Sequence, residues 1–208
     1  MNGPNNPFNP IAAKTRLRVN GDVREHKMGW FDNVRARVRR KGRIEIPSDQ
    51  LVILSKKVLV GENFSDRDLT GFSSEACHFR GCSFERMTIE SASFGAGKKE
   101  SLYEDCTFDG SEIYGDPGRA KFYRCSFRDI RLEGFFSLAA SYVECVFSGE
   151  IRRSVFHGSL PPTAMPYGQR QNEFSGNDFS EAILVDVDFR GGIDLSKQRM
   201  PKSWLRVR

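Results

Sequence analysis

A bulky apolar residue recurs at every fifth position of the stretch ACHFRGCSFERMTIESASF, residues 76 to 94. The repeated positions are Phe79, Phe84, Ile89 and Phe94. A helix repeats every 3.6 residues and a half-buried strand every two, so neither explains a sustained period of five. The chain must instead be built from a tandem five-residue unit that turns a corner at each repeat.

The same frame extends well beyond this stretch. It continues at Phe64, Leu69, Ser74, Tyr103, Phe108, Ile113, Phe122, Phe127, Leu132, Ser137, Tyr142, Phe147, Phe174, Phe179, Leu184 and Phe189. Phe156 arrives one residue early. Two residues before many of these centres stands a small or flexible side chain, as at Cys77, Cys82, Met87 and Ala92. Repetition at this density indicates a solenoid, in which each unit buries its apolar side against its neighbours.

This pattern resembles that of the pentapeptide-repeat proteins. The resemblance covers about residues 61 to 195 and implies an all-β fold, a right-handed quadrilateral β-helix in which four repeats form one coil. With rungs about 4.8 Å apart, about six coils give a rod on the order of 30 Å long. We expect a core ladder made by Phe79, Phe84, Tyr103, Phe108, Phe122, Phe127, Tyr142, Phe147, Phe179 and Phe189.

Residues that lie one coil apart should match in character, and three columns do. The columns are Phe84, Phe108, Phe127 and Phe147; Phe79, Tyr103, Phe122 and Tyr142; and Cys82, Cys106, Cys125 and Cys145. In each column, successive members lie 24, 19 and 20 residues apart. The shared offsets predict one insertion after Phe94 and one deletion before Phe122, both in Gly-rich sequence.

The repeats divide the chain into four parts. We predict a disordered tail at 1–13, a basic β-rich N-terminal cap at 14–60, the β-helix at 61–195 with loops near 95–101 and 158–170, and a C-terminal cap at 196–208. In the N-terminal cap, apolar residues alternate with charged ones around an Asn-Gly pair, which favours strands. A helical face formed by Trp30, Val34 and Val38 is the alternative.

Both ends of the β-helix need a cover, because an uncapped end exposes unpaired backbone. The segment LVILSKKVLV, residues 51 to 60, is predicted to be a buried strand that enters the first coil. At the other end, the candidates to cover the last coil are Leu195, Met200, Trp204 and Leu205.

Charge is unevenly distributed along the chain. Residues 1–60 carry 13 Lys+Arg against 5 Asp+Glu, residues 61–158 carry 12 against 16, and the remainder carries 7 against 6. The basic N-terminal segment, with Arg35, Arg37 and Arg39, has two interpretations. It is either a surface for nucleic acid or the solvated face of a small cap.

The resemblance also implies a partner. Quinolone-resistance members of the family are acidic rods that resemble duplex DNA and occupy the DNA site of gyrase. Here the register predicts ion pairs between coils that would cancel such a field: Asp105 with Arg124, Asp109 with Arg128, Glu112 with Arg131, Arg124 with Glu144, and Glu133 with Arg153. DNA mimicry would then depend on the first coils, which carry Glu62, Asp66, Asp68, Glu75, Glu85 and Glu90.

Gram-negative relatives of that type carry two projecting loops that touch the enzyme, and two insertions here are comparable. The first is GAGKKES after Phe94 and the second is GSLPPTAMPYGQR at 158–170. The contact candidates in them are Lys98, Lys99, Met165, Tyr167 and Arg170. The alternative is that both loops are neutral surface insertions, which solenoids tolerate.

Neither a metal site nor a catalytic site is indicated. All five cysteines stand two residues before a repeat centre, where a free thiol acts as a compact apolar side chain, and no metal-ligand spacing occurs. His26, His78 and His157 are scattered, and the spacing forces no carboxylate beside His78 or His157. No nucleophile, phosphate-loop or dinucleotide motif is present. We therefore expect no cofactor and no enzymatic activity.

The expected function is non-enzymatic binding of a macromolecule. The specific hypothesis is a bacterial protein that binds DNA gyrase and modulates or protects it, as in antibiotic resistance. The alternative is a protein–protein adaptor or immunity factor that contacts nucleic acid through its N-terminal segment. The sequence has no apolar run typical of a signal peptide or membrane helix, so we expect a cytoplasmic protein with no membrane partner. No dimerisation helix is evident after the last repeat, so we expect a monomer or weak dimer.

Overall fold

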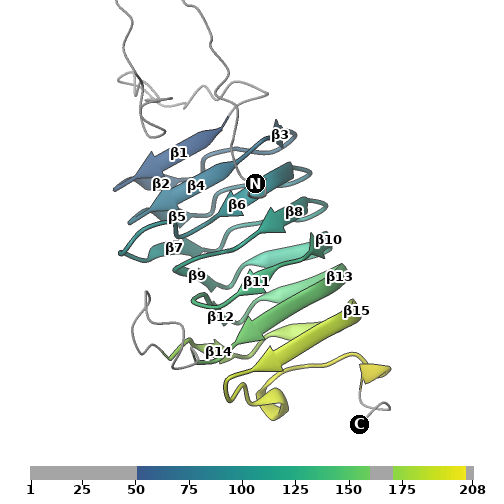
Figure 1. Ribbon diagram of the computed structural model, residues 1–208. Coiled ribbons are helices and arrows are strands. Elements are labelled where there is room, and N and C mark those ends of the chain that lie inside the picture. Colours follow the sequence, from purple (N-terminus) through teal and green to yellow (C-terminus); the bar gives the residue numbers. More distant parts are fainter. Residues whose placement is uncertain (1–50, 160–170, 205–208) are drawn as a thin grey trace, which may run out of the picture. The chain divides into compact units, whose positions relative to one another are not determined.

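The computed structural model describes residues 51–159 and 171–204, which coil into a β-solenoid (Figure 1). Its strands are β1 (Val52–Ser55), β2 (Val58–Val60), β3 (Asp68–Leu69), β4 (Phe72–Glu75), β5 (His78–Arg80), β6 (Thr88–Ser93), β7 (Ser101–Glu104), β8 (Glu112–Gly115), β9 (Ala120–Tyr123), β10 (Ser126–Glu133), β11 (Phe136–Ser137), β12 (Ser141–Val143), β13 (Val146–His157), β14 (Phe174–Ser175) and β15 (Asp178–Arg190). A short 3-10 helix, η2 (Leu195–Lys197), follows them. The described residues contain no α-helix, so the predicted all-β fold is confirmed.

Every pairing between these strands is parallel. One sheet has six strands in the order β14-β12-β9-β7-β5-β2, and the other has nine strands that include β1, β4, β6, β8, β10, β13 and β15. Each neighbour in the six-stranded sheet belongs to the next turn of the chain, so the sheet runs along the solenoid (Figure 1). Parallel strands need a crossover connection, and here the remaining sides of each coil supply it.

The register agrees with the separations in the sequence. Phe79 pairs with Tyr103, Tyr103 with Phe122, and Phe122 with Tyr142. One further residue is lost at Gly149, where the pairing of β10 with β13 shifts between Phe127 and Ile130. This shift explains why Phe156 arrives one residue early in the sequence.

The interior is filled by aromatic rings stacked coil upon coil. The ring centroids of Phe108 and Phe127 lie 4.7 Å apart at an interplanar angle of 7°, and those of Phe127 and Phe147 lie 4.9 Å apart at 2°. A second column stacks beside it and meets it edge-on; for example, the rings of Phe122 and Phe127 are inclined at 73°. Stacked and edge-to-face pairs each add about 0.5–1.5 kcal/mol beyond the buried area.

The ten residues of the predicted ladder all face this interior. Nine of them are at most 3% exposed, and only Phe189 is half-buried. The ring of Phe189 stacks on Phe156 at 5.4 Å and meets the indole of Trp204 edge-on at 5.9 Å. Trp204 and Met200 pack against the core at this C-terminal end, whereas Leu205 lies outside the described residues.

Many corners of the coils use a left-handed backbone two residues after the inward centre. Lys56, Asp66, Arg86 and Asp105 occupy this position with φ values of 53°, 60°, 51° and 52°. Non-glycine residues pay about 1–2 kcal/mol to adopt this conformation, so its recurrence shows that the turn geometry is imposed by the stacked coils. Corner side chains of successive coils consequently lie one above another on the outside.

The solenoid extends further toward the N-terminus than residue 61. β1 pairs with β4 and β2 pairs with β5 in the register of the later coils, so residues 52–60 form two sides of a coil rather than a single entering strand. The predicted tail at 1–13 and the cap segment up to residue 50, including its hairpin, lie outside the described residues. The same holds for residues 160–170 and 205–208.

Candidate interaction surface

The packed interior leaves the outer sides and corners as the places where this protein can meet a partner. Inside, consecutive rings stack at centroid distances such as 4.5 Å between Phe79 and Tyr103, which leaves no room for a ligand. An open groove of about 690 Å³ lies at the C-terminal end, between the start of β15 and residues 199–203. Within the described part of the chain, no three His, Cys, Asp or Glu side chains are placed to hold a metal ion.

The first predicted contact loop is held against the solenoid instead of projecting from it. Glu75 accepts a hydrogen bond from the backbone N–H of Lys98 at 3.3 Å, and Arg119 donates to the Lys98 carbonyl at 2.9 Å. The loop is also pinned by its backbone, since the N–H of Arg119 donates to the carbonyl of Gly95 at 2.8 Å. Lys98 and Lys99 are both exposed on this rigid support.

Close approach explains the glycines of this loop. A Cβ on Gly97 would lie 1.9 Å from Oε1 of Glu75, and a Cβ on Gly95 would lie 2.2 Å from the backbone of Arg119. The sequence GAGKKES is therefore a tightly fitted corner, which the insertion of four residues alone did not reveal. The other predicted contacts, Met165, Tyr167, Arg170, Arg35, Arg37 and Arg39, lie outside the described residues.

Three of the five predicted ion pairs between coils are present. Arg124 Nε lies 2.7 Å from Asp105 Oδ1, Arg131 lies 3.7 Å from Glu112, and Arg153 pairs with Glu133. The hydrogen bond from Arg124 holds the pKa of the Asp105 carboxyl below its usual value. These pairs neutralise charge along the corners, as the register predicted.

The other two pairs take a different form. The carboxylate of Asp109 accepts from the backbone N–H of Arg128 at 2.7 Å and from the Ser126 hydroxyl at 2.6 Å. Arg124 turns back toward Asp105, with two guanidinium contacts to that carboxylate at 2.7 and 2.8 Å and a third to Glu104 at 3.4 Å, and it forms no pair with Glu144. A bidentate pair satisfies the guanidinium better than two separate contacts, which explains the difference.

The acidic first coils are partly neutralised as well. Arg86 donates to both carboxylate oxygens of Asp66, at 2.7 and 2.9 Å, and contacts Glu85 at 3.3 Å. Glu75 is used to hold the 95–100 loop. Of the six acidic residues considered for DNA mimicry, only Glu62, Asp68 and Glu90 have no such role within the described part of the chain.

The expectation that no carboxylate stands beside His78 is wrong. Nε2 of His78 lies 3.2 Å from Oε2 of Glu104, which also accepts from Arg80 at 2.9 Å. The insertion after Phe94 pairs residue 78 with residue 102 and residue 80 with residue 104, so the carboxylate of Glu104 lies within reach of both the His78 and the Arg80 side chains. The signal was present in the sequence, because the offset of 24 residues between these coils brings Glu104 next to this row.

All five cysteines are free and buried. Four of them, Cys82, Cys106, Cys125 and Cys145, stack in the predicted column. A hydrogen bond with the Cys125 thiol and burial raise the pKa of Cys106 to about 12. Thiols held in the neutral form are poor nucleophiles and poor metal ligands, so this column is part of the core.

Sequence reasoning missed several exposed side chains that the fold presents. Val58 and Val60 on β2 are 75% and 64% exposed, and Phe136 and Ile183 are 52% and 62% exposed. Lys56 and Lys57 were also missed, because the segment from 51 to 60 was expected to be one strand. The sequence did indicate a corner at Lys56, since this residue stands two positions after the inward centre Leu54, as the other corner residues do after theirs.

The inward ladder, the left-handed corners and the in-register parallel coils define this chain as a β-solenoid built on a five-residue repeat. No family model matches the sequence, and no curated protein matches it. Among solved structures, a trypsin-treated form of QnrB1, a plasmid-mediated fluoroquinolone resistance protein, is 12% identical over 73% of this chain and 86% of that chain, with a TM-score of 0.32.

Two further structures of the same protein are similar to this chain. A second trypsin-treated form is 11% identical over 73% of this chain and 79% of that one, with a TM-score of 0.29. Full-length QnrB1 is 12% identical over 74% and 91%, with a TM-score of 0.25. Within the described residues, no helix has the length and apolar character needed to cross a bilayer.

Proposed function

We propose that this chain is a non-enzymatic binding protein whose outer surface meets a protein partner, and that the partner is a type II topoisomerase such as DNA gyrase. The observation that carries the first part is the filled interior. Rings from neighbouring coils lie in contact throughout, as with Phe147 and Phe179 at 4.4 Å, so binding has to use the outer sides. The second part rests on the sequence resemblance to topoisomerase-binding pentapeptide-repeat proteins.

The described surface supports contact through the loops more than DNA mimicry. Arg86, Arg124 and Arg153 neutralise acidic residues along three corner columns, and such a surface lacks the continuous negative charge of a duplex. Lys98 and Lys99 stand exposed on a fixed loop. We infer that these two lysines, together with Met165 and Tyr167 of the second loop, make the contact.

The test is a supercoiling assay with purified gyrase and full-length protein, with and without a quinolone. We expect inhibition or protection at micromolar protein, weakened about tenfold in Lys98→Ala/Lys99→Ala and in Met165→Ala/Tyr167→Ala. Lys197→Ala/Lys202→Ala, an equal loss of charge at the C-terminal end, is the matched control and should behave as the parent.

A second enzyme separates a gyrase effect from an effect on the DNA. Relaxation of the same plasmid by a type I topoisomerase should be unaffected. Inhibition of both enzymes, or no effect on gyrase, would contradict the topoisomerase proposal.

The alternative is an adaptor or immunity factor with another protein partner. The neutralised corners favour it, because they remove the main feature by which a rod of this kind imitates DNA. A gyrase-independent partner that is captured by the parent protein but not by Lys98→Ala/Lys99→Ala would favour this alternative.

A further inference from the structure

Four exposed lysines share one corner of the solenoid, which we call the lysine corner: Lys56, Lys57, Lys98 and Lys99. Lys56 and Lys57 follow β1, and the N–H of Lys56 donates to the carbonyl of Glu75 on the next coil. The N–H of Ala96 donates to the carbonyl of Ser74 from the following coil. These bonds place the two lysine pairs at the same corner, two rungs apart.

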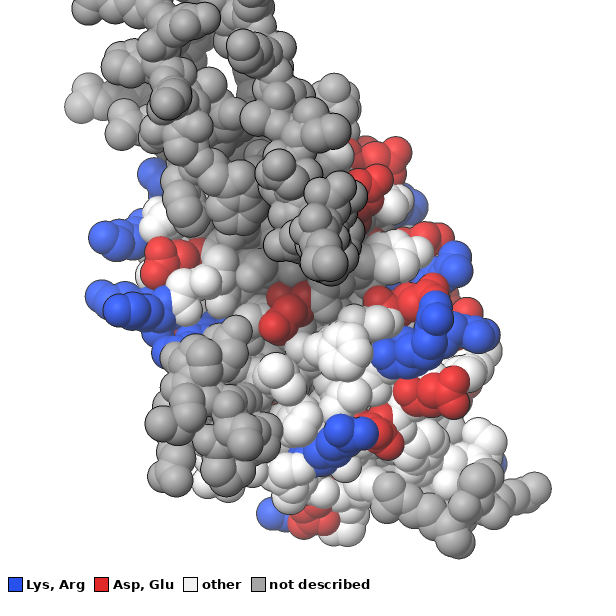
Figure 2. All heavy atoms as spheres, in the orientation of Figure 1, with Lys and Arg blue, Asp and Glu red and all other residues white. Residues whose placement is uncertain are grey.

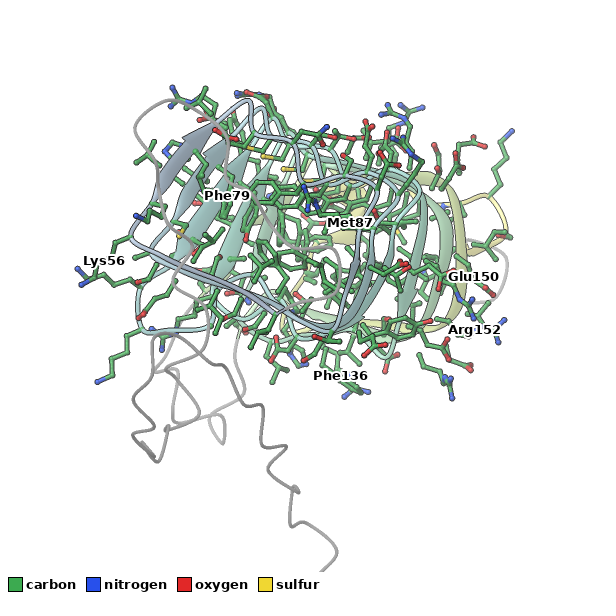
Figure 3. The ribbon with its side chains drawn as sticks, turned by 90° about the horizontal axis from the view of Figure 1, so that it is seen from above. Lys56, Phe79, Met87, Phe136, Glu150 and Arg152 are labelled. Carbon is green, nitrogen blue, oxygen red and sulfur yellow. The ribbon has the colours of Figure 1, made fainter. Side chains whose placement is uncertain are left out.

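The figures show the corner as a basic edge. In Figure 3, seen from above, Lys56 extends outward from the left corner, on the opposite side from Glu150 and Arg152. In Figure 2, Lys and Arg side chains lie at successive heights along the left side, with one acidic group among them, whereas Lys, Arg, Asp and Glu intermingle on the right. On the face seen in Figure 2, basic side chains therefore outnumber acidic ones along the left edge.

These lysines differ from the arginines in their partners. Eight arginines pair with carboxylates: Arg80, Arg86, Arg124, Arg131, Arg152, Arg153, Arg190 and Arg199. None of the four lysines forms an ion pair with a carboxylate of the described residues. Two acidic residues lie near the corner: Glu75, which directs Oε1 to the backbone of the 95–100 loop, and Glu100, which follows Lys99 in the chain. The charge of the corner is thus left available to a ligand.

We propose that the lysine corner binds the phosphodiester backbone of nucleic acid, independently of base sequence. Ammonium groups on flexible stems contact phosphates as point charges, whereas base reading relies largely on the planar fork of Arg or on amides. Two rungs separate the lysine pairs by about 10 Å, which corresponds along the axis of a duplex to about three phosphates of one strand, at a rise of about 3.4 Å each.

The sequence before the corner favours the same ligand. Residues 1–50 carry 11 Lys+Arg against 5 Asp+Glu, so the basic character continues along the chain directly into Lys56 and Lys57. An acidic protein surface is a less suitable ligand for all four lysines together, because the exposed apolar neighbours of Lys56 and Lys57 are Val58 and Val60, and valine is under-represented among the residues that anchor protein interfaces.

The experiment measures binding of the full-length protein to a fluorescent DNA duplex of about 20 base pairs by anisotropy, between about 50 and 200 mM salt. Replacing all four lysines by Gln should weaken binding at least about tenfold. It should also make the dependence of log K on log salt shallower, by up to about 0.9 for each phosphate that the variant no longer neutralises. The double variant Lys98→Gln/Lys99→Gln should show an intermediate effect. Equal melting temperatures of variants and parent establish that the fold is kept.

The matched control is Lys197→Gln/Lys202→Gln, which removes the same charge at the other end and should bind as the parent does. Equal weakening by the control and by Lys98→Gln/Lys99→Gln would overturn the proposal in favour of a net-charge effect. Unchanged binding in the fourfold variant would overturn it in favour of residues 1–50 alone.

Two competitors identify the ligand. Duplex RNA that competes as well as duplex DNA would support recognition of phosphates common to both. Duplex RNA that competes less well would also support phosphate binding and would indicate a preference for DNA. Polyglutamate of equal charge that competes better than either would overturn the proposal in favour of an acidic polypeptide. The binding assay contains no topoisomerase, so its result is independent of the supercoiling result.

Discussion

Tyr103 and Phe122 stack face to face inside the solenoid at 5.0 Å, and two residues further along the chain Asp105 and Arg124 form an ion pair at 2.7 Å. The same two coils thus repeat like residues in the interior and unlike residues at the corner. Identical aromatic rings on successive coils stabilise the fold, because equal shapes stack without voids. Charged residues one rung apart stabilise the fold only when their charges are of opposite sign.

The lysine corner departs from this rule. Lys56 is followed on the next coil by Ala76, which has the same left-handed backbone but no charge, and then by the loop that carries two more lysines. The three other corners contain pairs such as Asp66 with Arg86 and Glu133 with Arg153. The difference indicates that a corner of this solenoid can form without ion pairs between successive coils.

The strongest test of the interior is Phe127→Ala. This ring is 3% exposed between Phe108 and Phe147, and its removal should cost about 3–5 kcal/mol of unfolding free energy in urea. Phe136→Ala, which truncates a ring that is 52% exposed, is the control and should change stability by less than about 0.5 kcal/mol. Similar losses for the two variants would mean that the inward register is incorrect.

A smaller effect is expected where the cysteine column ends at Asn177. This fully buried amide accepts from the N–H of Cys145 at 3.0 Å and donates to the carbonyl of Tyr142 at 2.9 Å. Asn177→Ala leaves both groups unsatisfied and should cost about 1–3 kcal/mol in the same urea assay. Asn63→Ala, which removes an exposed amide that accepts from Ser65, should be nearly neutral, and a larger loss there than at Asn177 would contradict this account.

The cysteine column also predicts a loss of stability at high pH. Because the folded pKa of Cys106 is raised to about 12 from the ordinary 9.0, its contribution is full below pH 9 and is lost as pH rises toward 12. At pH 10 the expected loss is about 1 kcal/mol, measured by urea unfolding at pH 7 and pH 10. Cys106→Ala should lose less stability at alkaline pH than the parent, because it has no thiol to ionise at this position. Alanine should fit there, since Ala120 and Ala140 fill the corresponding position on another side of the solenoid. If the variant and the parent lost equal stability between pH 7 and pH 10, ionisation of Cys106 would not be the cause.

The smallest effects concern the corners themselves. Arg124→Ala should lower the melting temperature slightly at low salt, because the pair with Asp105 is exposed and screened. The pKa of Asp105 is lowered by Arg124, so this stabilisation is present above about pH 4 and is lost as pH falls below it. Lys56→Ala should leave the melting temperature unchanged at any salt concentration. A decrease equal to that of Arg124→Ala would contradict the conclusion that the lysine corner, unlike the Arg124 corner, contributes no ion pair to stability.

The five-residue period determined the repeating fold by itself. No helix or ordinary strand can bury a residue at every fifth position, and the offsets of 24, 19 and 20 between the columns decided which rings stack and which acids face which arginines. The free cysteine column followed from the same frame. Local sequence was sufficient because each coil contacts only its neighbours.

Tertiary structure decided where the frame breaks. Residues 52–60 join the first coil because β1 and β2 pair with β4 and β5, which a short apolar run cannot reveal without its partners. His78 meets Glu104 across an insertion. Glu75 and Arg119, from different coils, fold the 95–100 loop onto a corner beside Lys56. Contacts of this kind join residues far apart in sequence, and only the stacking of the coils brings them together.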